Sequence, residues 1–352
     1  MEANGQRPSR RSDGTLSGRR RQLPWPKDKR FRILSIDGGG IRGILPASIL
    51  AEFERRYLSG NSAGDYFDLI AGTSTGGIIA LGLSIGLPAS EILKLYFDHG
   101  AEIFPVAKPP LASLKRLWAK ARSLAYYQYD RRPLERELRR IFGACAFGEA
   151  QRRLCIPSFD GFTEVNIFKT PHHPDFRLDW REEMVTVALA TSAAPTYFSI
   201  YRDGQRRFAD GGVWANNPVM VALVDALTCY TLERDQIDIL SLGCGDAEIT
   251  MSDAQVLQGG VWHWREIVSS AMHLASQNAL GQTELLIGRD RLIRLIAPLL
   301  PGGAIGLDDV QRAKVELPVI AKDLAEENGE LVASRFYSGK ADPYAPFHGP
   351  QT

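Results

Sequence analysis

Residues 66–85 read Tyr-Phe-Asp-Leu-Ile-Ala-Gly-Thr-Ser-Thr-Gly-Gly-Ile-Ile-Ala-Leu-Gly-Leu-Ser-Ile. The apolar run at 66–71 predicts a buried strand, the small and hydroxyl residues at 72–77 predict a tight turn, and 78–85 predicts an apolar helix. The same order occurs earlier, where the strand-like run 31–36 precedes a glycine cluster and a helical pattern over 44–57. Two strand–turn–helix units in succession predict an α/β fold with a largely parallel sheet.

Elements further along the chain fit the same fold class. We expect a helix over 184–190, a short strand at 207–209 that runs into Asp210-Gly211-Gly212, a helix over 217–230, and a strand over 237–242. The sequence contains no internal repeat and no convincing linker. It therefore predicts one domain with insertions rather than two domains.

The composition of the 352 residues is that of an ordinary globular chain, with 44% hydrophobic and 24% charged residues. This excludes a disordered chain, a collagen-like fibre and a disulfide scaffold. Residues 1–32 hold ten Lys/Arg against three acidic residues, 10 − 3 = +7, which leaves about −6 for the remainder because the net charge is +1. We predict a disordered basic arm over 1–30, which is either simply solvated or in weak contact with anionic lipid or nucleic acid. The body shows no sign of a surface for duplex nucleic acid.

The four cysteines are scattered without a CxxC pair, and the N-terminus has no signal-peptide pattern, so a cytoplasmic location is expected. No charged residue occurs between Asp68 and Glu91, a gap long enough to span a bilayer. The many glycines in this gap favour a buried strand, turn and helix over a transmembrane helix.

A G-x-S-x-G motif, Gly72-Thr73-Ser74-Thr75-Gly76, falls between the predicted strand and helix. In this context the motif is typical of a sharp turn that presents a nucleophilic serine at a helix N-terminus. The alternative is a glycine- and serine-rich loop without chemistry. Ser74 is the candidate nucleophile.

A serine hydroxyl needs a base to become a nucleophile. None of the six histidines occupies a recognisable turn at a strand end, although a histidine triad stays open. Asp210 fits better, because it follows a short strand and precedes two glycines. The alternative for Asp210 is an ordinary Asp-Gly turn.

The first glycine cluster, Gly38 to Gly43, matches G-x-G-x-x-G. A dinucleotide site would need an acidic residue about twenty positions further on, at the end of a second strand. Asp65 and Asp68 come too late and flank the start of a strand, so this interpretation is weak. The alternative is a row of backbone N–H groups that face an oxyanion.

Glycine turns that supply oxyanion donors, a serine and an aspartate, in that order, resemble the patatin-like phospholipases. The resemblance implies a three-layer α/β/α fold over about residues 31–345 and a Ser–Asp dyad of Ser74 and Asp210. No cofactor is expected, and no metal either, because no His/Cys/Asp cluster has the spacing of metal ligands. It implies an oxyanion hole at Gly39 and Gly40 with the N–H of Thr75, and a bracing role for Arg42. The motif residues that carry it are Gly38, Gly39, Gly40, Arg42 and Gly43, then Gly72, Ser74, Thr75 and Gly76, then Asp210, Gly211 and Gly212.

The stretches 169–173, 188–198 and 208–218 also resemble the bacterial members that act in cyclic-oligonucleotide antiphage signalling. This narrower resemblance implies a phospholipase A1/A2-type enzyme that degrades the cell membrane after activation by a cyclic dinucleotide such as cGAMP. It implies a peripheral position at the inner membrane when active, with homo-oligomers forming on activation. No nucleotide pocket can be identified from the sequence.

Two segments are candidates for membrane contact. Residues 104–127 lack acidic residues and place Leu114, Leu117, Trp118 and Ala121 at helical spacing opposite basic residues, which suits a lid or an anionic lipid surface. A helix packed on the sheet would give the same pattern. The apolar segment 292–305 is either core or an exposed lid. The competing functions are a lipid hydrolase without nucleotide gating, a nucleotide-binding oxidoreductase, and a non-catalytic membrane or nucleic-acid binder.

Overall fold

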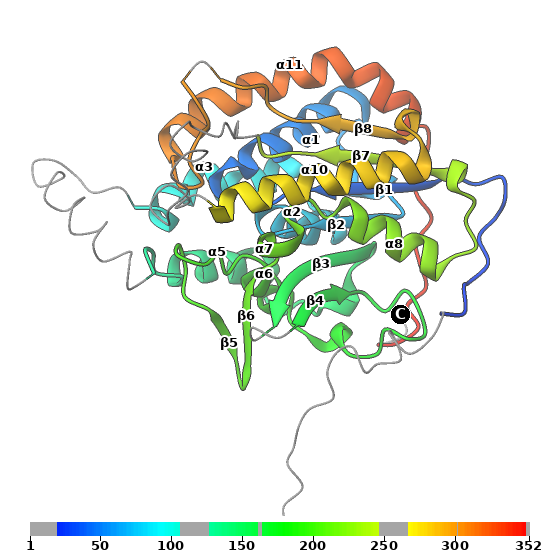
Figure 1. Cartoon of the computed structure of the whole chain (residues 1–352), viewed down its shortest axis with the longest axis horizontal. Coiled ribbons are helices and arrows are strands. Elements are labelled where there is room, and N and C mark those ends of the chain that lie inside the picture. Colours follow the sequence, from blue (N-terminus) through cyan, green and yellow to red (C-terminus); the bar gives the residue numbers. More distant parts are fainter. Residues whose placement is uncertain (1–19, 106–126, 161–163, 246–266, 301, 350–352) are drawn as a thin grey trace, which may run out of the picture.

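The structure is a computed structural model and describes residues 20–105, 127–160, 164–245, 267–300 and 302–349, with the backbone alone for 267–271. Its strands form one sheet in the order β5-β6-β3-β2-β1-β7-β8, and β4 pairs with β3 outside this path (Figure 1). The strands are β1 (Phe31–Ile36), β2 (Leu69–Gly72), β3 (Arg153–Asp160), β4 (Glu164–Lys169), β5 (Tyr201–Asp203), β6 (Arg206–Asp210), β7 (Ile237–Leu242) and β8 (Leu292–Leu295). The five strands β3-β2-β1-β7-β8 pair in parallel, and β4, β5 and β6 pair antiparallel. The predicted α/β fold with a largely parallel sheet is confirmed.

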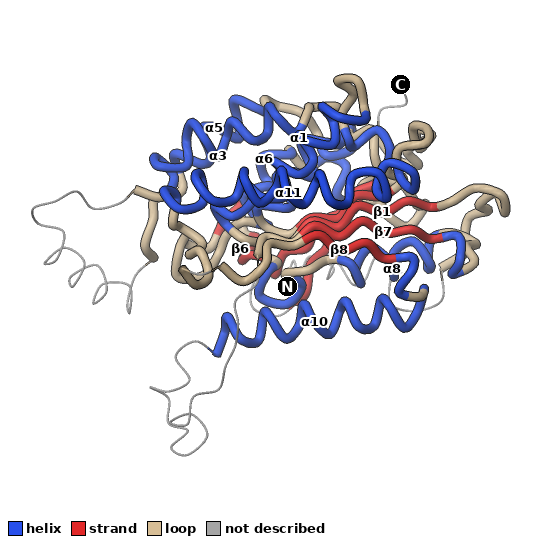
Figure 2. The backbone as a smooth tube through the Cα atoms, turned by 90° about the horizontal axis from the view of Figure 1, so that it is seen from above, coloured by secondary structure: helices blue, strands red, loops and turns tan. Residues whose placement is uncertain are grey.

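Helices cover both faces of the sheet and make three layers (Figure 2). Helices α1, α3, α5, α6 and α11 lie on one face, whereas α8 and α10 lie on the other. The helices are α1 (Ile44–Tyr57), α2 (Thr75–Ser84), α3 (Ala89–Ile103), α5 (Arg132–Phe142), α6 (Met184–Thr191), α7 (Gly212–Ala215), α8 (Val219–Cys229), α10 (Ile267–Ile287) and α11 (Val310–Phe336). The helices expected over 184–190 and 217–230 are present with shifts of one or two residues at their ends.

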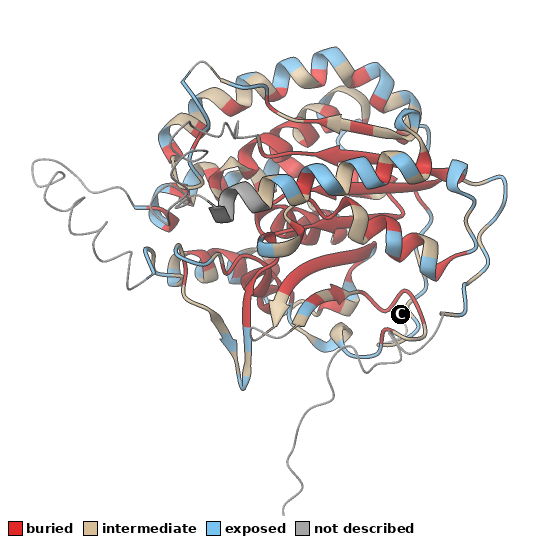
Figure 3. Cartoon of the chain, in the orientation of Figure 1, coloured by how far each residue is buried: buried red, intermediate tan, exposed pale blue. Residues whose placement is uncertain are grey.

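The period-two side-chain alternation of a strand explains why the sheet has a core on each face. In β1, Phe31 and Ile33 pack in the hydrophobic cluster that contains α8, whereas Leu34 and Ile36 pack in the cluster that contains α1. All six residues of β1 and of β7 are buried (Figure 3). Strands that are covered on both faces tend to be continuous apolar runs, which explains why the sequence pattern predicts β1 and β7.

The charge-free gap between Asp68 and Glu91 is a strand, a turn and a helix rather than one long helix. It holds β2 and α2, and α2 has only 10 residues. Among the helices that the structure describes, none combines the length and the apolar character that crossing a bilayer requires.

The N-terminal segment, residues 20–30, packs against the body, so the predicted disordered arm over 1–30 extends too far. Leu23 N–H donates to Cys229 O at 2.7 Å, and Thr231 N–H donates to Leu23 O at 2.9 Å. The Trp25 ring lies 4.8 Å from the Phe31 ring in an edge-on contact. Leu23 and Trp25, two apolar residues within a basic run, anchor this segment to the body. The average composition of residues 1–30 does not reveal them, because charged residues predominate there. Residues 1–19 lie outside the described residues.

Of the two segments that the sequence suggests for membrane contact, the structure describes only the second in full or in large part. Residues 106–126, which hold most of the predicted basic amphipathic helix, lie outside the described residues. The start of the segment 292–305 is the edge strand β8, where Ile293 and Leu295 are buried, so this part belongs to the core.

Candidate active site

Strand register brings the glycine loop and the serine turn side by side. Ile36, at the end of β1, pairs with Gly72, at the end of the parallel strand β2. The carboxyl ends of parallel strands lie at one edge of a sheet, so the loops that follow both strands emerge as neighbours there. A Cβ added to Gly38 would lie 3.4 Å from the Ser74 Cβ, which shows how closely the glycine loop approaches the serine.

Asp210 reaches the same place from the opposite direction. Strand β4 occupies one edge of β3, so β2 and the antiparallel β6 must share the other edge. Ala71 pairs with Cys155 and Asp210 pairs with Ser158 on that edge, so the carboxyl ends of β2 and β6 point at each other. The residues that follow β2 therefore meet the last residue of β6.

Ser74 occupies a strained turn between β2 and α2. Its backbone angles are φ 55° and ψ −119°, a combination that non-glycine residues rarely adopt. The flanking glycines permit the turn, because a Cβ at Gly72 would lie 2.1 Å from Gly76 O and one at Gly76 would lie 2.3 Å from Ile36 O. This is the geometry of a nucleophile elbow, with Ser74 directly before the first turn of α2.

The Ser74 hydroxyl donates a 2.6 Å hydrogen bond to Oδ2 of Asp210. The other carboxylate oxygen, Oδ1, accepts the Gly212 N–H at 2.7 Å, so the second glycine of the Asp-Gly-Gly turn fixes the orientation of the carboxylate. Burial raises the pKa of Asp210 to about 6, although the hydrogen bonds from Ser74 and Gly212 act in the opposite direction. A carboxylate with this pKa is ionised at neutral pH and is a better proton acceptor than an ordinary aspartate.

The glycine loop leaves backbone donors free beside Ser74. Gly38 N–H donates to Asn216 O at 2.9 Å, so it is already used. The N–H groups of Gly39, Gly40 and Thr75 have no hydrogen-bond acceptor in the part of the chain that the structure describes. Arg42 reaches across the loop, where Nε lies 3.4 Å from Gly39 O and a terminal nitrogen lies 3.3 Å from Gly245 O.

Thr75 joins the glycine loop to the elbow. A Cβ at Gly43 would lie 2.1 Å from Thr75 Oγ1, so only glycine fits there. The same hydroxyl makes a 2.5 Å hydrogen bond with the hydroxyl of the buried Tyr96, from α3. Tyr96 was not singled out from the sequence, and no local motif marks it.

Thr191 is a second residue that sequence reasoning did not assign a role. Its Oγ1 accepts the Ser74 N–H at 2.9 Å and donates to Pro157 O at 2.6 Å. Thr191 therefore holds the backbone of the elbow against β3. The only sequence signal for Thr191 is its place in the stretch 188–198, which resembles the bacterial members of the family.

The alternative readings of the motifs do not match this geometry. Among the described residues, the hydrogen-bond donors to the Asp210 carboxylate are the Ser74 hydroxyl and the Gly212 N–H rather than a histidine, and His263 lies outside the described residues. His172 instead hydrogen-bonds the buried Asp225 at 2.8 Å. A dinucleotide site would need an acid at the carboxyl end of β2, but Asp68 immediately precedes that strand and accepts the Arg32 N–H at 2.9 Å.

One cluster of potential metal ligands was invisible in the sequence spacing. Ligand atoms of His172, Asp225 and Cys229 lie within 4.8 Å of one another, and all three residues are buried. Asp225 already binds the Lys169 ammonium at 2.6 Å. Burial alone would raise the pKa of Asp225, but Lys169 and His172 hold it well below its usual range.

A mostly parallel sheet, a strained serine elbow and an aspartate at the facing strand end define a class of α/β proteins with the architecture of serine ester hydrolases. The family described as "Patatin-like phospholipase" matches residues 34–223, which is more than half of the chain. This chain therefore belongs to the patatin-like phospholipases, a family of carboxylic ester hydrolases.

Three curated relatives are each described as a "cGAMP-activated phospholipase". The chain is 39% identical to the protein of Escherichia coli TW11681 over 63% of this chain and 64% of that one. It is 34% identical to the Pseudomonas aeruginosa protein (72% of this chain and 75% of that one) and 37% identical to the Vibrio cholerae protein (72% and 76%). The aligned part thus spans from just under two-thirds to about three-quarters of these relatives' lengths.

Proposed function

We propose that this chain releases fatty acids from membrane phospholipids with Ser74 as nucleophile and Asp210 as general base. The observation that supports this most directly is the 2.6 Å hydrogen bond between them within a strained elbow. A hydroxyl bonded to a buried carboxylate whose pKa is raised has an acceptor for its proton in place before substrate binds.

In the first half-reaction, Ser74 Oγ attacks the ester carbonyl carbon and its proton passes to Asp210. The oxyanion that forms accepts hydrogen bonds from the free N–H groups of Gly39, Gly40 and Thr75. The ester C–O bond then breaks, and Asp210 returns its proton to the oxygen of the departing lysophospholipid. An acyl group remains on Ser74.

In the second half-reaction, a water molecule gives a proton to Asp210 and attacks the acyl carbonyl. The bond between the acyl carbon and Ser74 Oγ then breaks. Oγ takes the proton back from Asp210, and a free fatty acid leaves. The chain's own groups supply every proton acceptor and oxyanion donor in this scheme.

We further propose that a cyclic dinucleotide activates the enzyme at the inner membrane in antiphage defence. Three bacterial relatives that are described as cGAMP-activated phospholipases support this. The resemblance of the stretches 169–173, 188–198 and 208–218 to bacterial members of this kind points the same way. The dyad is already hydrogen-bonded, while Ser74 is 8% and Asp210 is 5% exposed. Activation would therefore act on access to the dyad rather than on its assembly. Oligomerisation on activation stays a prediction.

The experiment is fatty-acid release from vesicles of bacterial phospholipids, with and without a panel of cyclic dinucleotides and with Ser74→Ala as the blank. We expect release that depends on one cyclic dinucleotide. Strong release without any nucleotide would overturn the gating and keep the phospholipase, whereas equal release by Ser74→Ala would overturn the dyad.

A further inference from the structure

A cavity of about 390 Å³ lies far from the dyad, at the amino ends of the parallel strands. The N-terminal segment and the C-terminal segment, residues 342–347, form its walls together with Arg153, His172 and Tyr230. Figure 1 shows both segments beside the start of β1, whereas Ser74 follows the other end of β2. The volume falls within the range of about 300–1,000 Å³ typical of small-molecule sites. Because the cavity and Ser74 lie at opposite ends of the strands, this cavity cannot be the binding site of the scissile ester.

Three aromatic rings surround a guanidinium in this cavity. The Arg153 guanidinium carbon lies 5.5, 5.2 and 5.5 Å from the ring centroids of Trp25, Tyr230 and Tyr344. Aromatic rings and arginine planes are the usual stacking partners of nucleobases. A phospholipid headgroup offers no flat ring for them, so the wall chemistry favours a nucleotide.

The cavity also offers cationic groups for a phosphate. Arg153 is oriented by two hydrogen bonds, from Nε to Tyr230 OH at 2.8 Å and from one terminal nitrogen to Asp68 O at 3.1 Å. Its second terminal nitrogen has no hydrogen-bond acceptor within the described ranges. Lys29 Nζ pairs with Asp342 at 2.6 Å, and the Asp342 side chain is 80% exposed. A phosphodiester could replace this exposed carboxylate on Lys29.

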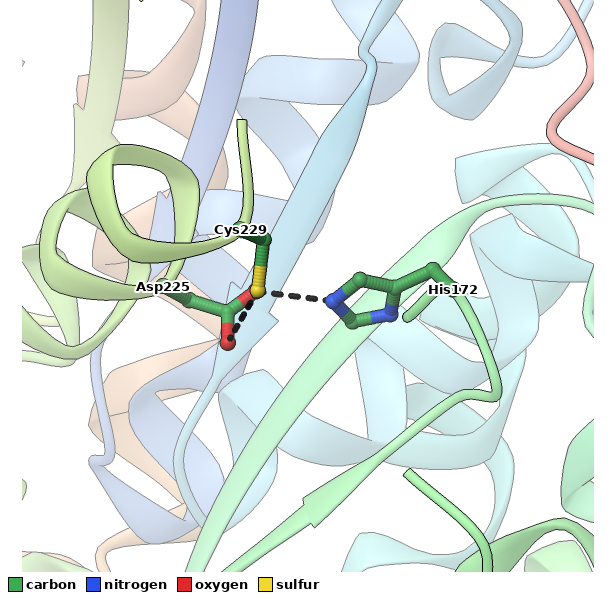
Figure 4. Close-up of side chains that lie close together, drawn as sticks. All are labelled: His172, Asp225 and Cys229. Atoms are coloured by element: carbon green, nitrogen blue, oxygen red, sulfur yellow. Dashed lines mark hydrogen bonds and ion pairs between the residues drawn. The ribbon is translucent and has the colours of Figure 1, made fainter. Parts of the chain in front are cut away.

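Helix α8 connects the cavity with the dyad. At its carboxyl end, Tyr230 lines the cavity, and Asp225 binds His172, another wall residue (Figure 4). Just before its amino end, Ala215 O accepts the Thr73 hydroxyl at 2.6 Å and Asn216 O accepts the Gly38 N–H at 2.9 Å. A helix of 11 residues, about 16 Å long, thus links the cavity wall to the residues beside Ser74.

We propose that this cavity binds one nucleotide unit of the cyclic dinucleotide activator. Because the Arg153 guanidinium fills the space between the three rings and Tyr230 is buried, the base stacks on the partly exposed rings of Trp25 and Tyr344. The phosphodiester binds Lys29 and Arg153 in place of Asp342. The inference rests on the proposed activation by a cyclic dinucleotide and gives that activation a site.

The test is calorimetric binding of cGAMP to the full chain, in parallel with fatty-acid release. Trp25→Ala should weaken binding by about 10-fold or more, because it removes a stacking ring. Lys29→Ala should weaken it by several-fold and reduce its salt dependence, whereas Asp342→Asn should tighten it by removing the competing carboxylate. Lys27→Ala removes the same charge from an exposed position outside the cavity wall and should leave the affinity for cGAMP unchanged.

The outcomes separate the site from the proposed function. Ser74→Ala should bind cGAMP like the wild type although it hydrolyses nothing. If cGAMP binds and activates the wild type while Trp25→Ala, Lys29→Ala and Asp342→Asn all bind with unchanged affinity, the site is wrong and the activation stands. If no cyclic dinucleotide binds the wild type while Ser74-dependent hydrolysis persists, both the activation and the site are overturned and the hydrolase stands. Lys29→Ala is expected to weaken cGAMP binding and Asp342→Asn to tighten it. Misfolding would weaken binding in both variants, so it cannot produce these opposite changes in affinity.

Discussion

The Ser74 hydroxyl lies 2.6 Å from the Asp210 carboxylate although 136 positions separate the two residues in the chain. The contact exists because β2 and β6 share one edge of β3 and run toward each other. Strand order, rather than any local motif, brings the proposed nucleophile and base together.

The rate of hydrolysis should depend on the ionisation of Asp210. Only the carboxylate can accept the serine proton, and burial raises its pKa to about 6. We expect kcat/KM on a soluble ester to be constant above about pH 7 and to fall about tenfold per pH unit below 6. Initial rates between pH 4.5 and 8.5 measure this, and a limb near pH 4 would contradict the raised pKa.

Asp210→Asn should stabilise the fold at neutral pH while it removes activity. Because the folded-state pKa lies above the ordinary value of 3.8, the ionised group destabilises the native state as pH rises from about 4 through 6. A shift of about 2 units corresponds to roughly 3 kcal/mol. Urea unfolding should show the variant more stable at pH 8 and similar to the wild type near pH 4. An equal difference at both pH values would exclude this origin.

Gly43→Ala should impair the elbow. The added methyl group would lie 2.1 Å from Thr75 Oγ1, so the glycine loop and Thr75 must separate. A displacement of about 1 Å in a catalytic site can reduce kcat about 100-fold. The matched control is Gly281→Ala in α10, where the methyl group meets nothing within 4 Å and should slightly stabilise the helix. Unchanged kcat in Gly43→Ala would refute the steric argument.

Thr191→Val should lower kcat more than it raises KM. The substitution leaves the Ser74 N–H and Pro157 O without their hydroxyl partner, at a cost of about 1–3 kcal/mol for each buried group. Thr191→Ser keeps the hydroxyl and should restore most of the activity. If both variants are equally impaired, the methyl group matters and the hydroxyl does not position the elbow.

The sequence alone predicts the sheet and the residues of the proposed dyad. It does not predict the side chains that hold the serine elbow in place. Buried parallel strands such as β1 and β7 are apolar runs, so the sequence pattern alone reveals them. Ser74 follows the strand β2 and Asp210 ends the strand β6, each beside a glycine turn, so these signals are local as well. Thr191 and Tyr96 reach the elbow from α6 and α3, and their hydrogen bonds to it depend on packing that no motif encodes.

The docking of the N-terminal segment and the His172–Asp225 pair could not be predicted from the sequence for the same reason: both depend on contacts between residues that are far apart in the chain. Leu23 and Trp25 dock 20–30 through contacts with residues near 230, about 200 positions away. His172 and Asp225 are 53 positions apart, so spacing rules for ligand clusters do not detect them. Composition described the segment as a tail because charged residues outnumber the two side chains that anchor it.

The most direct test of the central claim is identification of the residue labelled by a fluorophosphonate ester, by mass spectrometry of the full chain with and without cGAMP. The account predicts a single adduct on Ser74, no adduct at this site in Ser74→Ala, and labelling at least about 100-fold slower in Asp210→Asn, because the proton acceptor is lost. An adduct on a different residue, or labelling of Asp210→Asn at the wild-type rate, would contradict the Ser74–Asp210 dyad.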